Sequence, residues 1–149
     1  MKIAFLAAAL AACALARADE PKVTVKLPKA VPTVGGKLNL SVRVEFDPGL
    51  HGYQNPPSNE FQIPLKISTP SKGFKLTAKY PKGVIKQFNG EDTAVYEGTI
   101  EIPVTVDLPK KAGSYSLAIV VDYQQCNESA CFPPGSIKSE LKFKVAAKK

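Results

Sequence analysis

Apolar and polar residues alternate along much of the chain. Every second residue is apolar from Leu38 to Phe46, from Ile100 to Leu108, from Tyr115 to Tyr123 and from Leu141 to Val145. A period of two is what a strand with one buried face and one solvent-exposed face requires. Shorter candidate strands are residues 23–27, 63–68 and 74–80. No stretch has a convincing helical period of 3.6 residues, so an all-β fold is predicted.

Turn-forming residues separate these stretches, among them Gly35-Gly36, Asn89-Gly90 and Pro133-Pro134. About seven short strands with such turns predict an antiparallel β-sandwich of immunoglobulin-like architecture. Two connections, residues 47–62 and 81–94, are longer than a sandwich needs and hold aromatic residues. We interpret both as loops, and loops on a β scaffold are where function is usually carried.

The first eighteen residues, MKIAFLAAALAACALARA, predict a secretory signal peptide that is cleaved after Ala18. The basic residue Lys2 precedes an apolar run, and small residues occupy positions 16 and 18. Residues 19–149 then form a single exported domain, periplasmic or secreted. Residues 10–13 also resemble a bacterial lipobox that would lipidate Cys13, an alternative that we favour less. No apolar run is long enough to span a membrane comfortably.

Charge adds little to this picture. The formal net charge is +7, and two of the positive charges lie in the predicted signal peptide. The lysines are spread along the chain, and no basic stretch is interleaved with aromatic residues. Nucleic-acid binding is therefore not expected.

The segment YQQCNESACFPP, residues 123–134, contains the two cysteines outside the predicted signal peptide. A structural bridge between Cys126 and Cys131 would stabilise the fold by about 2 kcal/mol, against about 4 kcal/mol for one that spans half the domain. A tetrahedral zinc site requires four ligands. Apart from carboxylates, the candidate ligands after residue 18 are these two thiols and His51, so no metal or other cofactor is expected. A redox pair is the third possibility, although Asp122 and Glu128 would disfavour a nearby thiolate.

This segment resembles the YQ-x-C…C-x-PP signature of the N-terminal periplasmic domain of the thiol:disulfide interchange protein DsbD and of related stand-alone domains. The stretches GLHGYQNPPSNEFQIP, YPKGVIKQFNGEDTAVYEG and TIEIPVTVDL agree with that family in the same order, so the resemblance covers nearly the whole chain after residue 18. Four residues separate the cysteines here, fewer than in the best-known members. The membrane and thioredoxin-like domains of full-length DsbD are not part of this sequence.

The resemblance implies an immunoglobulin-like sandwich in which Cys126 and Cys131 are the redox-active pair. Phe88, in KQFNG, matches the phenylalanine that caps the cysteines, and His51, Tyr53 and Tyr123 lie around them. A hydrophobic plug without a gating role is the simpler alternative for Phe88, and an ordinary loop imidazole is the simpler one for His51.

The resemblance also implies partners. The electron acceptors would be periplasmic thioredoxin-fold proteins that serve disulfide isomerisation or cytochrome c maturation, and a separate membrane or thioredoxin-like protein would be the donor. We expect Cys126 to be the attacking thiol. The alternative function is a secreted β-sandwich that binds proteins and whose disulfide is purely structural. A hydrolase is not supported, because no nucleophile and base occur together.

Overall fold

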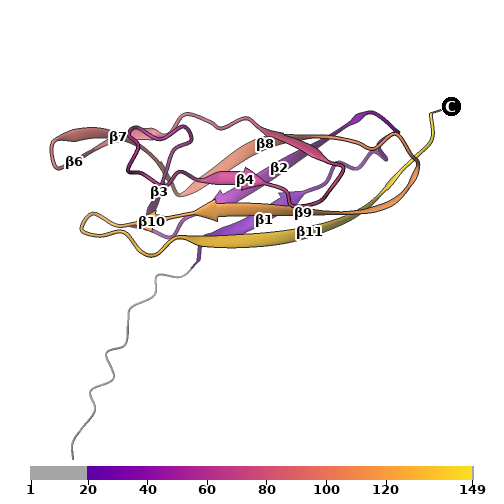
Figure 1. Ribbon diagram of the computed structural model, residues 1–149. Helices are drawn as coiled ribbons and strands as arrows, with labels where there is room; N and C mark the ends of the chain where they lie inside the picture. Colours follow the sequence, from indigo (N-terminus) through magenta and orange to yellow (C-terminus); the bar gives the residue numbers. More distant parts are fainter. Residues whose placement is uncertain (1–19, 149) are drawn as a thin grey trace, which may run out of the picture.

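The computed structural model describes residues 20–148 (Figure 1). The predicted signal peptide and Cys13 lie outside the described residues. Within residues 20–148 the chain forms eleven strands and no helix. The strands make three sheets, and the fold is an immunoglobulin-like antiparallel β-sandwich, as predicted.

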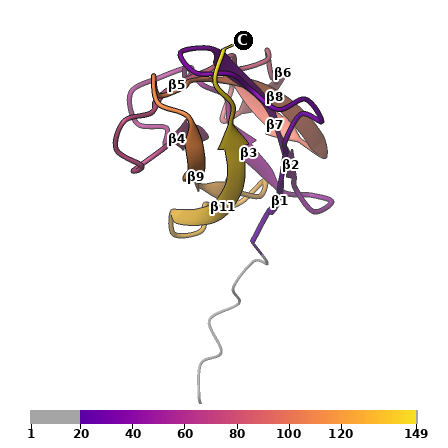
Figure 2. The same cartoon turned by 90° about the vertical axis from the view of Figure 1, so that its right-hand side faces the viewer.

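Two of the sheets form the sandwich. The first has the order β1-β2-β8-β5, with the bounds Lys22–Lys26, Lys37–Glu45, Thr99–Asp107 and Lys75–Ala78. The second has the order β11-β9-β4, with the bounds Gly135–Val145, Gly113–Tyr123 and Lys66–Ser68. Figure 2 looks along the sandwich and shows β9 and β11 on one side and β1 and β2 on the other.

The core lies between these two sheets and consists of the alternating residues expected from the sequence. Every second residue from Leu38 to Phe46 is buried, as is every second one from Ile102 to Leu108. Leu117, Ile119 and Val121 of β9 are fully buried opposite them. Each such side chain contributes about 1.5–3 kcal/mol by leaving water. The predicted alternation is therefore confirmed in the strands that form the sandwich.

The third sheet has the order β10-β3-β7-β6 and lies at one end of the sandwich (left in Figure 1). Its strands are β10 (Gln125–Cys126), β3 (His51–Tyr53), β7 (Glu91–Glu97) and β6 (Val84–Phe88). All four were missed, because two are very short and the β6–β7 pair alternates poorly. Residues 81–94 are therefore largely a hairpin and not a loop. Its turn is Asn89-Gly90, both with positive φ, which is the preferred two-residue hairpin turn.

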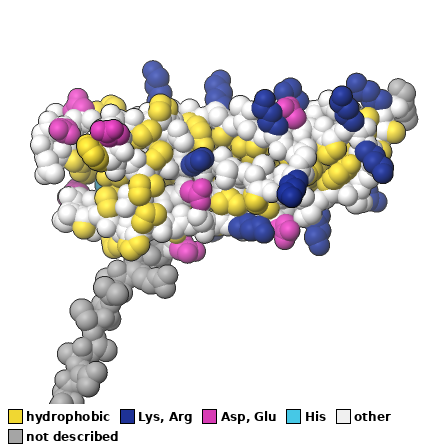
Figure 3. Space-filling model, viewed as in Figure 1, with side chains coloured by type: hydrophobic (Ala, Val, Ile, Leu, Met, Phe, Trp, Pro, Cys, Tyr) yellow, Lys and Arg dark blue, Asp and Glu magenta, His cyan; other side chains and the backbone are white. Residues whose placement is uncertain are grey.

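The surface agrees with the expected spread of charge. In Figure 3 the lysine and arginine side chains are scattered along the sandwich, whereas acidic side chains gather over the end that carries β6 and β7. Within residues 20–148, no helix is long and apolar enough to cross a membrane.

Candidate active site

A small hairpin after β9 brings the two cysteines together. Cys126 and Cys131 face each other in an antiparallel bridge, with their Cα atoms 3.9 Å apart, and their sulfur atoms form a disulfide. The side chain of Asn127 holds the turn between them: its Oδ1 accepts hydrogen bonds from the backbone N–H groups of Ser129 and Ala130, each at 2.8 Å. An asparagine that accepts from the residues after it is a common way to fix such a turn.

The third sheet places Cys126, His51 and Glu97 in one row. Cys126 on β10 pairs with His51 on β3, and His51 pairs in turn with Glu97 on β7. Directly paired residues of antiparallel strands project to the same face, with Cβ atoms about 4.5–5.5 Å apart. The histidine therefore lies between a cysteine and a carboxylate.

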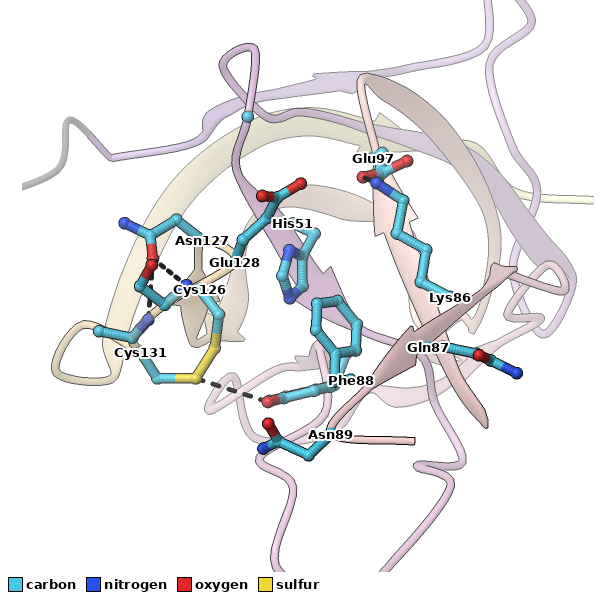
Figure 4. A pocket seen from close by; sticks show the side chains of 14 residues that line it. His51, Lys86, Gln87, Phe88, Asn89, Glu97, Cys126, Asn127, Glu128 and Cys131 are labelled. Atoms are coloured by element: carbon cyan, nitrogen blue, oxygen red, sulfur yellow. Dashed lines mark hydrogen bonds and ion pairs between the residues drawn. A yellow bond between two sulfur atoms is a disulfide. The ribbon is translucent and has the colours of Figure 1, made fainter. Parts of the chain in front are cut away.

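This row faces a cavity of about 750 Å³, which is lined by β3, β6, β7 and the 126–131 hairpin. The ring of Phe88 stacks on the imidazole of His51, with centroids 4.9 Å apart. Figure 4 shows these two rings between the disulfide on one side and the Lys86–Glu97 ion pair on the other. The cysteines, His51, Tyr53 and Phe88, all singled out from the sequence, thus line one cavity.

The two cysteines differ in exposure. Cys126 is only 1% exposed, whereas Cys131 is exposed to solvent. The hydroxyl of Tyr53 lies 3.4 Å from Sγ of Cys131, and it donates because a disulfide sulfur carries no hydrogen. The buried residue of the pair is thus Cys126, which we expected to attack, and the exposed one is Cys131.

His51 is buried, with 3% of its surface exposed. Burial lowers the pKa of His51 below its usual 6.5, against the carboxylate of Glu97, which raises it. Lys86 lowers this pKa further, and Glu128 raises it. Because desolvation is the largest of these effects, His51 is neutral at pH 7.

Tyr123 does not line the cavity. It ends β9, is 5% exposed, and pairs with Gly135 on β11. A Cβ at position 135 would lie 2.6 Å from the Tyr123 hydroxyl oxygen, so the ring packs directly over that glycine. Tyr123 therefore supports the base of the cysteine hairpin.

Three residues of the site were not anticipated: Glu97, Lys86 and Asn127. The first two reach the site through the pairing of β3, β7 and β6, for which the sequence carries no local signal. Asn127 had a signal, since an asparagine followed by small and polar residues is typical of a turn. Among the described residues, no group of three or more His, Cys, Asp and Glu side chains is arranged to hold a metal ion.

Comparisons with known proteins agree with the resemblance. The family described as thiol:disulfide interchange protein DsbD, N-terminal, matches residues 20–142. No curated protein matches the chain significantly. One similar solved structure is the N-terminal periplasmic domain of ScsB from Proteus mirabilis, with a TM-score of 0.61 and 16% identity over 86% of this chain and 47% of that chain. This chain thus spans about half the length of that protein chain.

A second similar structure is the DsbD N-terminal domain of Neisseria meningitidis in its reduced form. Its TM-score is 0.52, with 19% identity over 83% of this chain and 89% of that chain. At these identities both structures bear on the fold alone. The family match, in contrast, extends over most of the sequence, including both cysteines of the disulfide. The chain therefore belongs to the family of N-terminal domains of the thiol:disulfide interchange protein DsbD.

Proposed function

We propose that this chain is an exported thiol–disulfide exchange domain that passes reducing equivalents through Cys126 and Cys131. One observation carries the proposal: the disulfide joins an exposed residue, Cys131, to a buried residue, Cys126, beside a cavity. A carrier needs an accessible sulfur for its partner and a second, protected sulfur that completes the exchange. Membership of the DsbD N-terminal family supports the same chemistry.

The exchange proceeds in two steps. In the reduced domain the thiolate of Cys131 attacks the disulfide of a partner, which forms a mixed disulfide and releases one partner thiolate. Cys126 then attacks Sγ of Cys131, re-forms the Cys126–Cys131 disulfide and releases the partner's second sulfur. Two electrons leave the domain for the partner. The reverse sequence reloads the domain from its donor.

Phe88 serves as the cap in this proposal. Its ring lines the cavity with the disulfide and stacks on His51, so it would limit the access of small thiols to the disulfide from the side of the cavity. A docked partner displaces the ring and takes its place. The β6–β7 hairpin that carries Phe88 is suited to such a movement, because β6 is an edge strand whose one neighbour among the described strands is β7.

The acceptors would be thioredoxin-fold proteins of the periplasm, which serve disulfide isomerisation or cytochrome c maturation. The donor would be a separate membrane or thioredoxin-like protein. Residues 1–18 would direct export, and residues 19–149 would act as a single domain. Membership of the family and the likeness to the periplasmic domain of ScsB support this location.

Trapping tests the proposal in the exporting cell. The Cys126→Ser variant keeps the exposed sulfur and lacks the resolving one, so it should accumulate a mixed disulfide with a thioredoxin-fold protein identified by mass spectrometry. The matched Cys131→Ser variant keeps only the buried sulfur and should trap far less. If neither variant captures a thioredoxin-fold partner, the domain is instead a protein-binding module with a structural disulfide.

A further inference from the structure

One buried titratable side chain has no part in the two steps above. His51 lies in the row between Cys126 and Glu97 and is 3% exposed. A buried imidazole next to a sulfur that must react is in position to handle its proton. This inference rests on the proposed function and assigns a role within it.

The second step requires a proton acceptor. Only a thiolate attacks a disulfide, and burial disfavours the thiolate of Cys126, which is 1% exposed. Glu128, in the turn that follows β10, adds a negative charge that disfavours the thiolate further. Lys86, which lines the cavity, is paired with Glu97. Cys126 therefore depends on a neighbouring base that removes its proton, rather than on a positive charge that stabilises its thiolate.

His51 meets the requirements of that base. It is neutral because burial lowers its pKa, so its ring can accept a proton. Glu97 from β7 and Glu128 from the turn favour the imidazolium that forms, while Lys86 from β6 opposes it. Tyr53, on the same strand as His51, is engaged with the sulfur of Cys131. Before a partner docks, the ring of Phe88 stacks on the imidazole.

We propose that His51 is the general base of the resolving step: it accepts the proton of Cys126 as that sulfur attacks Sγ of Cys131, and Glu97 stabilises the imidazolium. The S–H bond of Cys126 breaks and the Cys126–Cys131 bond forms. The bond between Cys131 and the partner breaks, and its electron pair leaves with the partner's sulfur. The proton then passes from His51 to that departing thiolate or to water.

A chromogenic aromatic disulfide, 5,5′-dithiobis(2-nitrobenzoic acid), separates the two steps. One equivalent added to the reduced protein releases one coloured thiolate when Cys131 attacks and a second when Cys126 resolves the mixed disulfide. The His51→Gln variant should slow the second phase relative to the first by about a hundredfold at pH 7, the lower range for general-base catalysis.

Two charge variants give a readout that a purely structural role would not move. Glu97→Gln removes the charge that raises the pKa of His51, so the pH at which the second phase levels off should fall. Lys86→Gln removes a charge that lowers this pKa and should move that pH upward. These opposite shifts decide the matter even if His51→Gln does not fold.

Each outcome has a definite meaning. A second phase in His51→Gln with the rate and pH profile of the wild type overturns the base role, as does equal slowing of both phases or a pH profile that neither charge variant shifts. Failure of the wild-type protein to release the second thiolate contradicts the proposed function itself. The two failures are thus distinguishable.

Discussion

The ring of Phe88 lies on the imidazole of His51, with centroids 4.9 Å apart and ring planes inclined by 30°. The two residues come from β6 and β3, which β7 separates within the third sheet. The stack thus crosses the sheet on the side of the cavity and joins the hairpin of β6 and β7 to the strand beside Cys126.

Removing the Phe88 ring should open the disulfide to small reductants. An aromatic pair contributes about 0.5–1.5 kcal/mol, so Phe88→Ala should speed reduction by dithiothreitol by about twofold to tenfold. Stopped-flow measurement of the reduction rate checks this. Phe61→Ala is the matched control, because Phe61 is 87% exposed and its removal uncovers no sulfur. Equal rates in Phe88→Ala and wild type would show that Phe88 is no cap.

The Tyr53 hydroxyl should assist the first step. It donates to Sγ of Cys131 at 3.4 Å, and such a bond strengthens when the sulfur is a thiolate. Tyr53→Phe should slow the attack of Cys131 on a small disulfide by about fivefold at pH 7, which corresponds to about 1 kcal/mol. Tyr115→Phe is the control, since the Tyr115 hydroxyl donates to Lys111 away from the site. An unchanged rate in Tyr53→Phe would remove this role.

Asn127 should determine how readily the disulfide closes. Its side chain accepts two backbone hydrogen bonds inside the cysteine turn. Asn127→Ala loses them, which favours the open dithiol by about 1 kcal/mol and raises the reduction potential by about 20 mV. Asn127→Asp keeps the acceptor and should stay nearer the wild type. Equilibration in thiol–disulfide buffers measures both, and no difference between the variants would contradict the role of the turn.

Burial of His51 should also appear in the pH dependence of stability. The unfolded chain binds a proton at His51 near pH 6.5, whereas burial lowers the pKa of the folded protein. The stability linked to His51 is therefore fully present above about pH 6.5, and it is lost as the pH falls toward the pKa of His51 in the folded protein.

The His51→Gln variant has no imidazole at this position, so it does not lose stability in this way as the pH falls. The difference in the free energy of unfolding between wild type and His51→Gln should change between pH 8 and pH 5, to the disadvantage of the wild type at the lower pH. Urea denaturation at each pH measures this difference. The other titrating groups affect both proteins equally, so their effects cancel in the difference. A difference that stays constant would mean that His51 protonates as easily in the folded protein as in the unfolded one.

The sandwich could be predicted from the sequence and the site sheet could not. The stretch from Leu38 to Phe46 alternates without exception, because β2 buries one face along its whole length. The seven predicted strands correspond to the two sheets of the sandwich. β3 has only three residues, one of which is Gly52, and β10 has only two. Strands of this length have no period to detect.

The candidate site, too, could be predicted from the sequence only in part. Cys126 and Cys131 are neighbours in sequence, so their proximity could be foreseen. That His51 pairs with Cys126 depends on a contact between β3 and β10, which lie far apart in the sequence. Family resemblance brought His51, Tyr53 and Phe88 to attention, but their burial and mutual contacts emerge only once the third sheet is assembled. The unequal exposure of the two cysteines follows from that same assembly.

The reduction potential of the Cys126–Cys131 disulfide tests the central claim most directly. Equilibration of the purified mature domain with redox buffers of known potential, followed by thiol alkylation, measures it. The proposed exchange function predicts a reduction potential between about −120 and −300 mV, the range of thiol–disulfide exchange proteins. A value well below about −300 mV would mean a permanent structural bridge and would contradict the proposed function.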